Sequence, residues 1–343
     1  MRLVKTFLFV FVLFSLLLVA SCTTSVGFRV TRPGQLDLNG AKTIAVLPFK
    51  PYAYYKLDSD ASTAKKLVYS FFQIFDKTGP EEKKALEYLQ SNIEDGLNSS
   101  PYIELIPASK VTNALNKGYI NPADVYLAGE VTLFSITDEK TVDKVVVEEA
   151  DSSTGKKETY DYVTKYVRRV QFDLKYQVID SSDETILAYN TISIDNTSSK
   201  YDSKSDFPSA YSLIESDLYN AYRRILKELQ PWVAYRTVTL LKDKSKNEDF
   251  KKATQFAKDK KIDLSYDMFK KVYDETGMFE AGYNAALLQM ALGNLSVSEK
   301  EMNDLYKKTA DQRASRALND IQNEIKLAKK LKNQIEEKEL TLD

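Results

Sequence analysis

Apolar and polar residues alternate strictly along residues 169–178, within the segment RVQFDLKYQVID at residues 169–180. Every second side chain there is apolar or aromatic, and the residues between them are polar or charged. A strand with this period of two buries one face and exposes the other. We therefore predict a half-buried strand, with its buried face formed by Val170, Phe172, Leu174, Tyr176 and Val178.

Further β-rich runs surround this strand. The segment DSSTGKK separates two of them and contains the residues of a tight turn, which is a hairpin signature. We expect all the runs to belong to one sheet, with the most C-terminal run as its last strand. They occupy residues 42–49, 102–106, 124–136, 142–150, 159–167, 186–194 and 235–241.

Helical spacing of apolar residues marks three segments among these strands. Residues 80–97 begin with Pro80, which suits a first helical turn, and repeat apolar residues on one face. Residues 107–118 predict a small helix that ends at a glycine. Residues 208–229 predict a longer amphipathic helix.

The pattern changes after residue 242, where strand signals stop and helical spacing continues to the C-terminus. A shift of 33 residues superimposes small and apolar positions in this region. A period in the low thirties, with small residues where helices approach closely, is typical of helix-turn-helix repeats. The matched pairs are Ala253 with Ala286, Ala257 with Met290, Ser265 with Ser298, and Phe269 with Met302.

The second copy of this repeat, residues 282–309, resembles a tetratricopeptide repeat. The resemblance depends on Ala285 and Ala286, on Leu292-Gly293 at the turn, on Ser298 at a usual alanine position and on Met302 at a usual aromatic position. The first copy lacks the Leu-Gly turn, and two plain helical hairpins are the alternative. The resemblance implies paired antiparallel helices whose packing residues are Ala253, Ala286, Gly293, Ser298 and Met302.

The N-terminal residues have the pattern of a secretory signal. Arg2 and Lys5 precede an apolar run at residues 7–19, which is too short to span a bilayer comfortably. The segment VASC at residues 19–22 then resembles the lipobox of bacterial lipoproteins. That resemblance implies a diacylglycerol on the thiol of Cys22 and removal of the signal just before it. An ordinary signal peptide with an incidental cysteine is the alternative.

A second resemblance concerns the region before residue 242. The order strand, helix, strand, small helix, strand, with GAKTIAVLPF at residues 40–49, looks like the α/β domain of the envelope proteins CsgG, LpoB and TolB. The aromatic segment at residues 51–80, with a short helix expected at residues 64–75, departs from the compact members of that group. An unrelated α+β domain with the same order of elements is the alternative.

These patterns predict an α+β fold class and four parts of the chain. The only cysteine is Cys22, so no disulfide can form within the chain and each domain depends on core burial. We expect a lipoprotein signal peptide at residues 1–21, a lipidated N-terminus and tether at residues 22–38, a mixed α/β sheet domain at residues 39–241, and an all-α domain resembling tetratricopeptide repeats at residues 242–343.

Composition excludes several kinds of chemistry. The chain has no histidine and one cysteine, which removes the usual serine-histidine and cysteine-histidine hydrolases and the common zinc sites. It has no P-loop and no dinucleotide-binding glycine motif. With 48 basic and 49 acidic residues, and no basic stretch free of acidic neighbours, it is not expected to bind nucleic acid. We expect neither a cofactor nor a metal site.

Carboxylates are the remaining candidates for catalysis, and a carboxylate-dependent hydrolase stays open as a less favoured alternative. Glu148 and Glu149 lie beside the hairpin turn, where charge usually serves solvation. The segment DSSDET at residues 180–185 lacks the glycine and the terminal glutamate of an EF-hand, so it indicates a turn. We therefore predict that the protein is not an enzyme.

Two functions remain. The first is a lipoprotein of the cell envelope, anchored through Cys22 in the outer membrane and facing the periplasm, that binds envelope proteins of unknown identity. The second is a CsgG-like secretion-pore component, a homo-oligomer whose hairpin strands enter a membrane. Lys165, Arg168 and Arg169 crowd one of those strands and favour the first function. The 22 tyrosines, with clusters at Tyr52-Tyr54-Tyr55 and Tyr160-Tyr162-Tyr166, suit an interface, although a compositional bias would also explain them.

Overall fold

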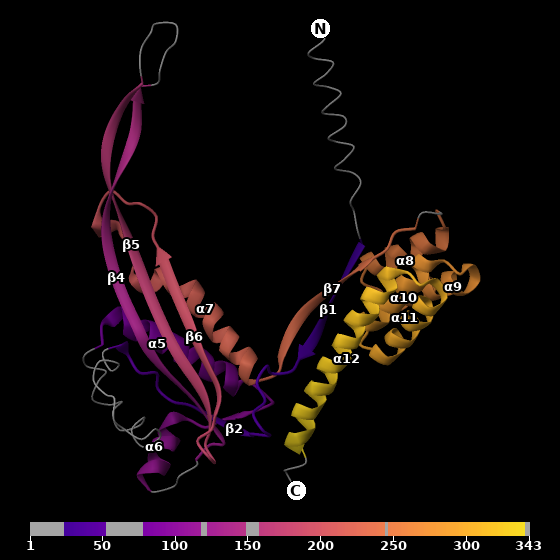
Figure 1. Cartoon of the computed structure of the whole chain (residues 1–343), viewed down its shortest axis with the longest axis horizontal. Coiled ribbons are helices and arrows are strands. Elements are labelled where there is room, and N and C mark those ends of the chain that lie inside the picture. The colour runs from indigo at the N-terminus through magenta and orange to yellow at the C-terminus, as the bar shows by residue number, and fades with distance from the viewer. Residues whose placement is uncertain (1–23, 53–77, 118–121, 149–157, 244–245, 340–343) are drawn as a thin grey trace. The chain divides into compact units, whose positions relative to one another are not determined.

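The computed structural model describes residues 24–52, 78–117, 122–148, 158–243 and 246–339 (Figure 1). The chain forms two compact units, each built from segments that are distant in sequence. The sheet unit comprises the described residues of Gly34–Trp232 and Gln334–Asp343, and the helical unit comprises those of Met1–Pro33 and Val233–Asn333. Strands dominate the first unit and helices the second, so the fold class is α+β, as predicted.

Five described strands form the sheet of the sheet unit. They are β2 (Thr43–Val46), β3 (Glu104–Leu105), β4 (Val125–Glu148), β5 (Thr159–Asp180) and β6 (Ile186–Thr197). Their order is β3-β2-β4-β5-β6, with β2 parallel to β3 and β4, and with β4-β5 and β5-β6 antiparallel (Figure 1). Phe172 of β5 lies opposite Phe134 and Ile194, so the apolar positions of neighbouring strands share one face.

Helices cover both faces of this sheet. On one face, α5 (Pro80–Asn98) and α7 (Ala210–Leu229) bury their apolar stripes in the same core as β5, which contains the fully buried Leu89, Ile214 and Phe172. On the other face, α6 (Ala108–Asn116) places Val111 against Ala45. A short 3-10 helix, η2 (Lys204–Asp206), precedes α7. The predicted helices at residues 80–97, 107–118 and 208–229 are therefore confirmed.

The strands differ from the prediction in length. Residues 124–136 and 142–150 were expected as separate strands, but they belong to one strand, β4, whose pairing with β5 continues through the polar residues between them. The predicted strand at residues 102–106 is reduced to the two residues of β3. The hairpin is confirmed, whereas its turn and the aromatic insertion with its expected helix lie outside the described residues.

The helical unit combines a small sheet with helices. Strands β1 (Thr24–Arg32) and β7 (Trp232–Leu240) pair with each other. Val26 of β1 and Val238 and Leu240 of β7 lie in the same buried core as the helices. The described helices are α8 (Glu248–Lys258), α9 (Ile262–Thr276), α10 (Phe279–Ala291), α11 (Leu295–Thr309) and α12 (Gln312–Glu339).

The structure corrects two expectations about this region. Residues 24–32 of the segment expected as a tether, residues 22–38, form the strand β1. Residues 235–240 of the strand expected at residues 235–241 belong to the small sheet rather than to the large one. Compact packing of the helical unit therefore begins at Val233 and includes a segment from the start of the chain. The pairing joins strands about two hundred residues apart, and no local sequence pattern reports such a partner.

A buried ion pair fastens β1 to α12 within the helical unit. The Arg32 guanidinium donates to both carboxylate oxygens of Glu324, at 2.5 and 2.7 Å, and Arg236 of β7 approaches the same carboxylate at 3.2 Å. Arg32 and Glu324 are 7% and 4% exposed. Removing one partner of such a pair leaves a buried charge and typically costs about 3–5 kcal/mol. This contact explains why β1 belongs to the helical unit.

Candidate interaction surfaces

The repeat positions form matching contacts between the two helices of each hairpin. Ser265 Oγ donates a hydrogen bond of 2.8 Å to the carbonyl oxygen of Ala253, and Ser298 Oγ donates one of 2.7 Å to the carbonyl oxygen of Ala286. All four residues are completely buried. Each serine therefore joins the second helix of its hairpin to the first at an equivalent point.

The remaining repeat residues lie in the core or at a turn. Phe269 on α9 and Met302 on α11 are completely buried at equivalent positions. Gly293, between α10 and α11, has a φ of +85°, a conformation that favours glycine. Lys260, at the corresponding turn between α8 and α9, has a φ of +60°. The first hairpin thus keeps the turn geometry without the glycine.

An open groove lies between α9 and α11 and crosses α10. Its volume is about 580 Å³, and the buried residues Gly282, Ala285 and Leu305 form its floor. Gly282 is needed there because a Cβ atom would lie 2.8 Å from the Tyr273 ring, which forms one wall. The other lining residues are Lys270, Asp274, Ser296, Val297, Lys300, Glu301, Asp304 and Lys308.

Glu301 is a partly buried carboxylate in this groove. Its Oε1 accepts a hydrogen bond of 2.9 Å from the Tyr266 hydroxyl. Its Oε2 is buried and has no hydrogen-bond partner among the described residues. Burial raises the pKa of the Glu301 carboxyl above its ordinary value, and the bond from Tyr266 opposes that shift. No feature of the sequence had drawn attention to this residue, because its role depends on neighbours from three helices.

The sheet unit carries a second surface, at the end of the β4-β5 hairpin. The helix-covered part of the sheet ends where Asp138 accepts two hydrogen bonds from Arg168, at 2.8 and 2.9 Å. Arg168 also donates to the Pro208 carbonyl at 3.2 Å, just before α7, and lies over the Phe207 ring. Beyond this ion pair, residues 139–148 and 159–167 continue as a ribbon, here called the hairpin arm (Figure 1). Tyr201 pairs with Tyr166 at its base, through backbone hydrogen bonds of 2.8 and 2.9 Å.

The hairpin arm exposes apolar and aromatic side chains. The register places Val142, Val146, Tyr160 and Tyr162 on one face, because Val146 lies opposite Tyr160 and Lys144 opposite Tyr162. Their exposed fractions are 59%, 43%, 42% and 68%. With Val145 and Val147 they make up six of the fourteen large exposed apolar residues in the described part of the chain. The tyrosine cluster noted in the sequence was the one signal of this surface.

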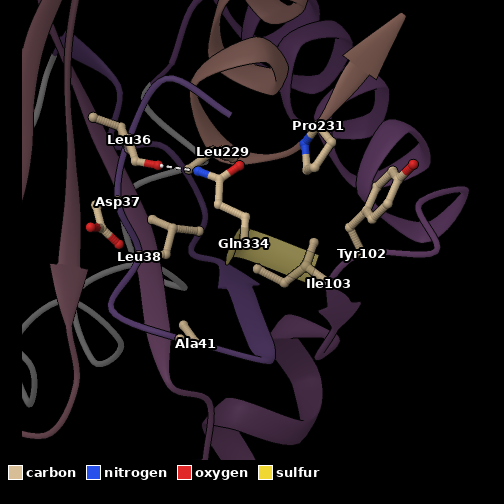
Figure 2. Close-up of a pocket in the computed structure, with 10 residues that line it drawn as sticks. Leu36, Asp37, Leu38, Ala41, Tyr102, Ile103, Leu229, Pro231 and Gln334 are labelled. Atoms are coloured by element: carbon tan, nitrogen blue, oxygen red, sulfur yellow. Dashed lines mark hydrogen bonds between the residues drawn. The ribbon is translucent and has the colours of Figure 1, made fainter. Parts of the chain in front are cut away.

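A small hollow lies in the sheet unit beside the end of α7 (Figure 2). Gln334 occupies one side of it, where its side-chain amide donates to the carbonyl oxygens of Gly34 and Leu36 at 3.1 and 3.2 Å and accepts from Gly34 N at 3.0 Å. The free volume is about 50 Å³, enough for a few water molecules. This hollow is therefore a packing feature rather than a ligand site.

The buried carboxylate of Glu228 has a structural role. The Tyr176 hydroxyl donates to it at 2.7 Å, and Asn190 and Arg224 donate at 3.2 and 3.3 Å. Burial, and then the bond to Glu228, raise the pKa of the Tyr176 hydroxyl above its ordinary value. Both carboxylate oxygens are engaged, so this cluster offers no free acid or base.

The other sequence candidates carry no assembled site. Asp180 accepts hydrogen bonds from Ser182, and Asp183 accepts one from Thr185 N, so residues 180–185 form a turn. Within the described ranges, histidine, cysteine and carboxylate side chains form no group of three or more that could hold a metal ion. Nor does that part of the chain contain a helix with the length and apolar character needed to cross a bilayer. Cys22 and Glu149 lie outside the described residues.

Comparisons with known proteins give distant similarities only. No family model and no curated protein matches the sequence. Similar solved structures include a hypothetical protein from Chlamydia trachomatis, at 11% identity and a TM-score of 0.28 over 55% of this chain and 97% of that one. Others are a protein from Xanthomonas campestris, at 14% identity and a TM-score of 0.30 over 58% of this chain and 86% of that one, and a lipoprotein from Neisseria meningitidis, at 12% identity and a TM-score of 0.21 over 53% of this chain and 98% of that one. These similarities assign no function to this chain.

Proposed function

We propose that the protein is a non-enzymatic protein of the cell envelope, anchored in a membrane through a diacylglycerol on Cys22, that acts by binding other envelope proteins. The anchor and the periplasm-facing location rest on the secretory signal and the lipobox-like segment at residues 19–22. The observation that carries the binding role is the hairpin arm with its exposed apolar face.

The physical argument for binding is the cost of leaving this face in water. Val142, Val146, Tyr160 and Tyr162 share one face of the two strands, so their exposed side chains are neighbours rather than scattered. Lys144 lies on the same face, with its ammonium over the Tyr160 ring. Contiguous apolar patches on soluble regions usually mark interaction sites. Tyrosine suits such a site because it combines apolar area with a polar tip. Past the pairing of Tyr166 with Tyr201, the arm is a two-stranded ribbon, and such a ribbon is only marginally stable until something packs on it.

The proposal includes a tetratricopeptide-like fold for the helices of the helical unit and a CsgG-like fold for the sheet unit. The serine-carbonyl contacts, repeated 33 residues apart, support a tetratricopeptide-like arrangement of α8 to α11. The order of elements in the sheet unit supports a domain like those of CsgG, LpoB and TolB. Association of several copies through the arm would be a form of the same binding function.

A shortened arm tests the proposal. Lys140 lies opposite Tyr166, so residues 141–165 can be replaced by the two-residue turn Asn-Gly without altering the register below. We expect the variant to fold and to fractionate with membranes, but to lose the cross-linked partners that the parent chain recovers. A companion variant with Val142→Ser and Tyr162→Ser should lose the same partners.

The matched control places the same changes elsewhere. Val233 and Tyr189 are exposed to 63% and 57%, and Val233→Ser with Tyr189→Ser should leave partner recovery unchanged. If the arm variants keep their partners, the arm is not the binding surface. The anchor is tested separately by Cys22→Ser, which should release the protein from membranes, and persistent membrane partition would contradict lipidation.

A pore component is the second candidate, and the arm is the observation that favours it. Its strands are long enough for a membrane-crossing strand, which takes roughly 9–11 residues. Lys140 and Lys144 on the apolar face argue against a lipid-facing position, which is costly for lysine near the bilayer centre. Dye release from vesicles by the full mature protein, lost in the arm variant, would favour the pore over protein binding.

A further inference from the structure

We infer that the groove between α9 and α11 binds a protein segment that presents an aliphatic side chain beside a basic one. This site is distinct from the hairpin arm and does not rest on the function proposed for it. The groove lies between the second helices of the two hairpins, over the first helix of the second hairpin.

The floor of the groove defines the aliphatic part of the occupant. Gly282 and Ala285 on α10 and Leu305 on α11 present little beyond hydrogen and methyl groups, and the exposed Val297 extends this apolar strip to the lip. The Tyr273 ring, packed directly over Gly282, forms one wall. A volume of about 580 Å³ holds a branched side chain together with its neighbour in a peptide.

The basic part of the occupant follows from Glu301. Its Oε1 is engaged by Tyr266, whereas its Oε2 is buried without a hydrogen-bond donor. A buried carboxylate oxygen in that state is unfavourable until a donor reaches it. A basic side chain entering from the groove supplies a charge-assisted hydrogen bond after rotation of the carboxylate about its last side-chain bond.

Among the described contacts no lysine of the groove donates a hydrogen bond to Glu301, although the charge of Lys270 opposes the rise that burial causes in the pKa of the Glu301 carboxyl. Lys270 pairs with Asp274, and Lys308 lies 3.4 Å from the Tyr273 hydroxyl. Lys300 is exposed at the lip. Asp304 lies one turn after Glu301 on α11 and also lines the groove. Three carboxylates and three lysines line the groove, so its formal charges balance, and the buried oxygen of Glu301 rather than the net charge favours a basic side chain at this point.

The test uses two peptides and the full mature chain carrying Cys22→Ser, so that no lipid interferes. One fluorescein-labelled twelve-residue peptide contains Leu-Leu-Arg in a Gly-Ser background, and the other has Gln in place of Arg. Fluorescence anisotropy should give a dissociation constant about tenfold lower for the Arg peptide. Glu301→Gln should abolish that difference, which is the signature of a direct coupling in a double-mutant cycle.

Two further variants complete the test. Glu248→Gln changes an exposed carboxylate on α8 that pairs only with Lys251 among the described contacts, and it should leave both affinities unchanged. Val297→Ser should weaken both peptides equally, because it removes apolar contact at the lip. The inference is overturned if the two peptides bind equally to the parent chain, if Glu301→Gln preserves the preference, or if neither peptide binds at about 1 mM. The shortened arm should not alter peptide binding, so failure here is distinguishable from failure of the proposed function.

Discussion

Lys260 and Gly293 lie 33 residues apart in the sequence and adopt the same left-handed backbone conformation. Each ends the turn after the first helix of its hairpin, and each backbone N–H donates a hydrogen bond of 3.1 Å, to Ala257 and Met290 respectively. A side chain with a Cβ atom is disfavoured in this conformation, whereas glycine is not. The first hairpin therefore carries a backbone strain that the second avoids.

Replacing Lys260 by glycine should relieve that strain. We expect Lys260→Gly to raise the free energy of unfolding of the helical unit by about 1 kcal/mol. Urea unfolding followed by circular dichroism measures the change. Lys258→Gly is the control, since glycine inside the last turn of α8 should instead cost roughly 1 kcal/mol. A loss of stability in Lys260→Gly would show that the lysine side chain makes a compensating contact.

The buried serine hydrogen bonds should contribute similarly to the free energy of unfolding in the two hairpins. Ser298→Ala removes the hydrogen bond to the Ala286 carbonyl, and Ser265→Ala removes the one to Ala253. Each should lower the free energy of unfolding by about 1 kcal/mol, the usual net value of such a bond. The exposed Ser296→Ala should change stability by less than about 0.5 kcal/mol. Equal stability of all three variants would mean that these bonds contribute nothing.

The effect of Gly282→Ala on the free energy of unfolding should depend on the side chain at position 273. An alanine in a helix interior normally stabilises by about 0.5–1 kcal/mol relative to glycine. At position 282 the added Cβ would meet the Tyr273 ring at 2.8 Å, so Gly282→Ala should destabilise the parent chain. In a chain that carries Tyr273→Ala, the same Gly282→Ala change should stabilise. Thermal unfolding of the four proteins measures this cycle, and additive effects would contradict the steric explanation.

The ion pair at the root of the hairpin arm should make stability depend on pH. The hydrogen bond from Arg168 lowers the pKa of the Asp138 carboxyl below its ordinary value of 3.8. Because the folded pKa is depressed, this contribution is complete above about pH 4 and is lost as the pH falls through the folded pKa. Asp138→Asn should therefore have a lower free energy of unfolding than the parent at pH 7, and this difference should become smaller below pH 4.

A surface pair provides the comparison for that measurement. Arg169 and Asp195 also form a bidentate pair, but their side chains are each 45% exposed, against 22% and 24% for Arg168 and Asp138. Solvent screens such a pair more strongly, so Asp195→Asn should have the smaller effect at every pH. A larger effect of Asp195→Asn would mean that burial does not govern the contribution of these pairs.

Local patterns determined most of the elements. Helices α5 and α7 follow from apolar stripes with a period near four, and the strand β5 follows from strict alternation around Phe172. The sequence also predicted the repeat, in which Ala253 and Ser265 correspond to Ala286 and Ser298. Close contacts between helices restrict residue size at a fixed spacing, and this leaves a pattern in the sequence. The interaction surfaces were only partly readable, because the tyrosine cluster indicated the arm but nothing indicated Glu301.

The sequence by itself therefore determined the fold class, the helices, the hairpin and the spacing of the repeat, all of which depend on residues within a few turns of one another. The tertiary structure alone decided that β1 pairs with β7 and that Arg32 meets Glu324 across most of the chain. It also decided that Tyr273, Gly282 and Glu301 lie around one groove. Such contacts join positions distant in sequence, and they arise from packing shape and paired charge, which no periodic pattern records.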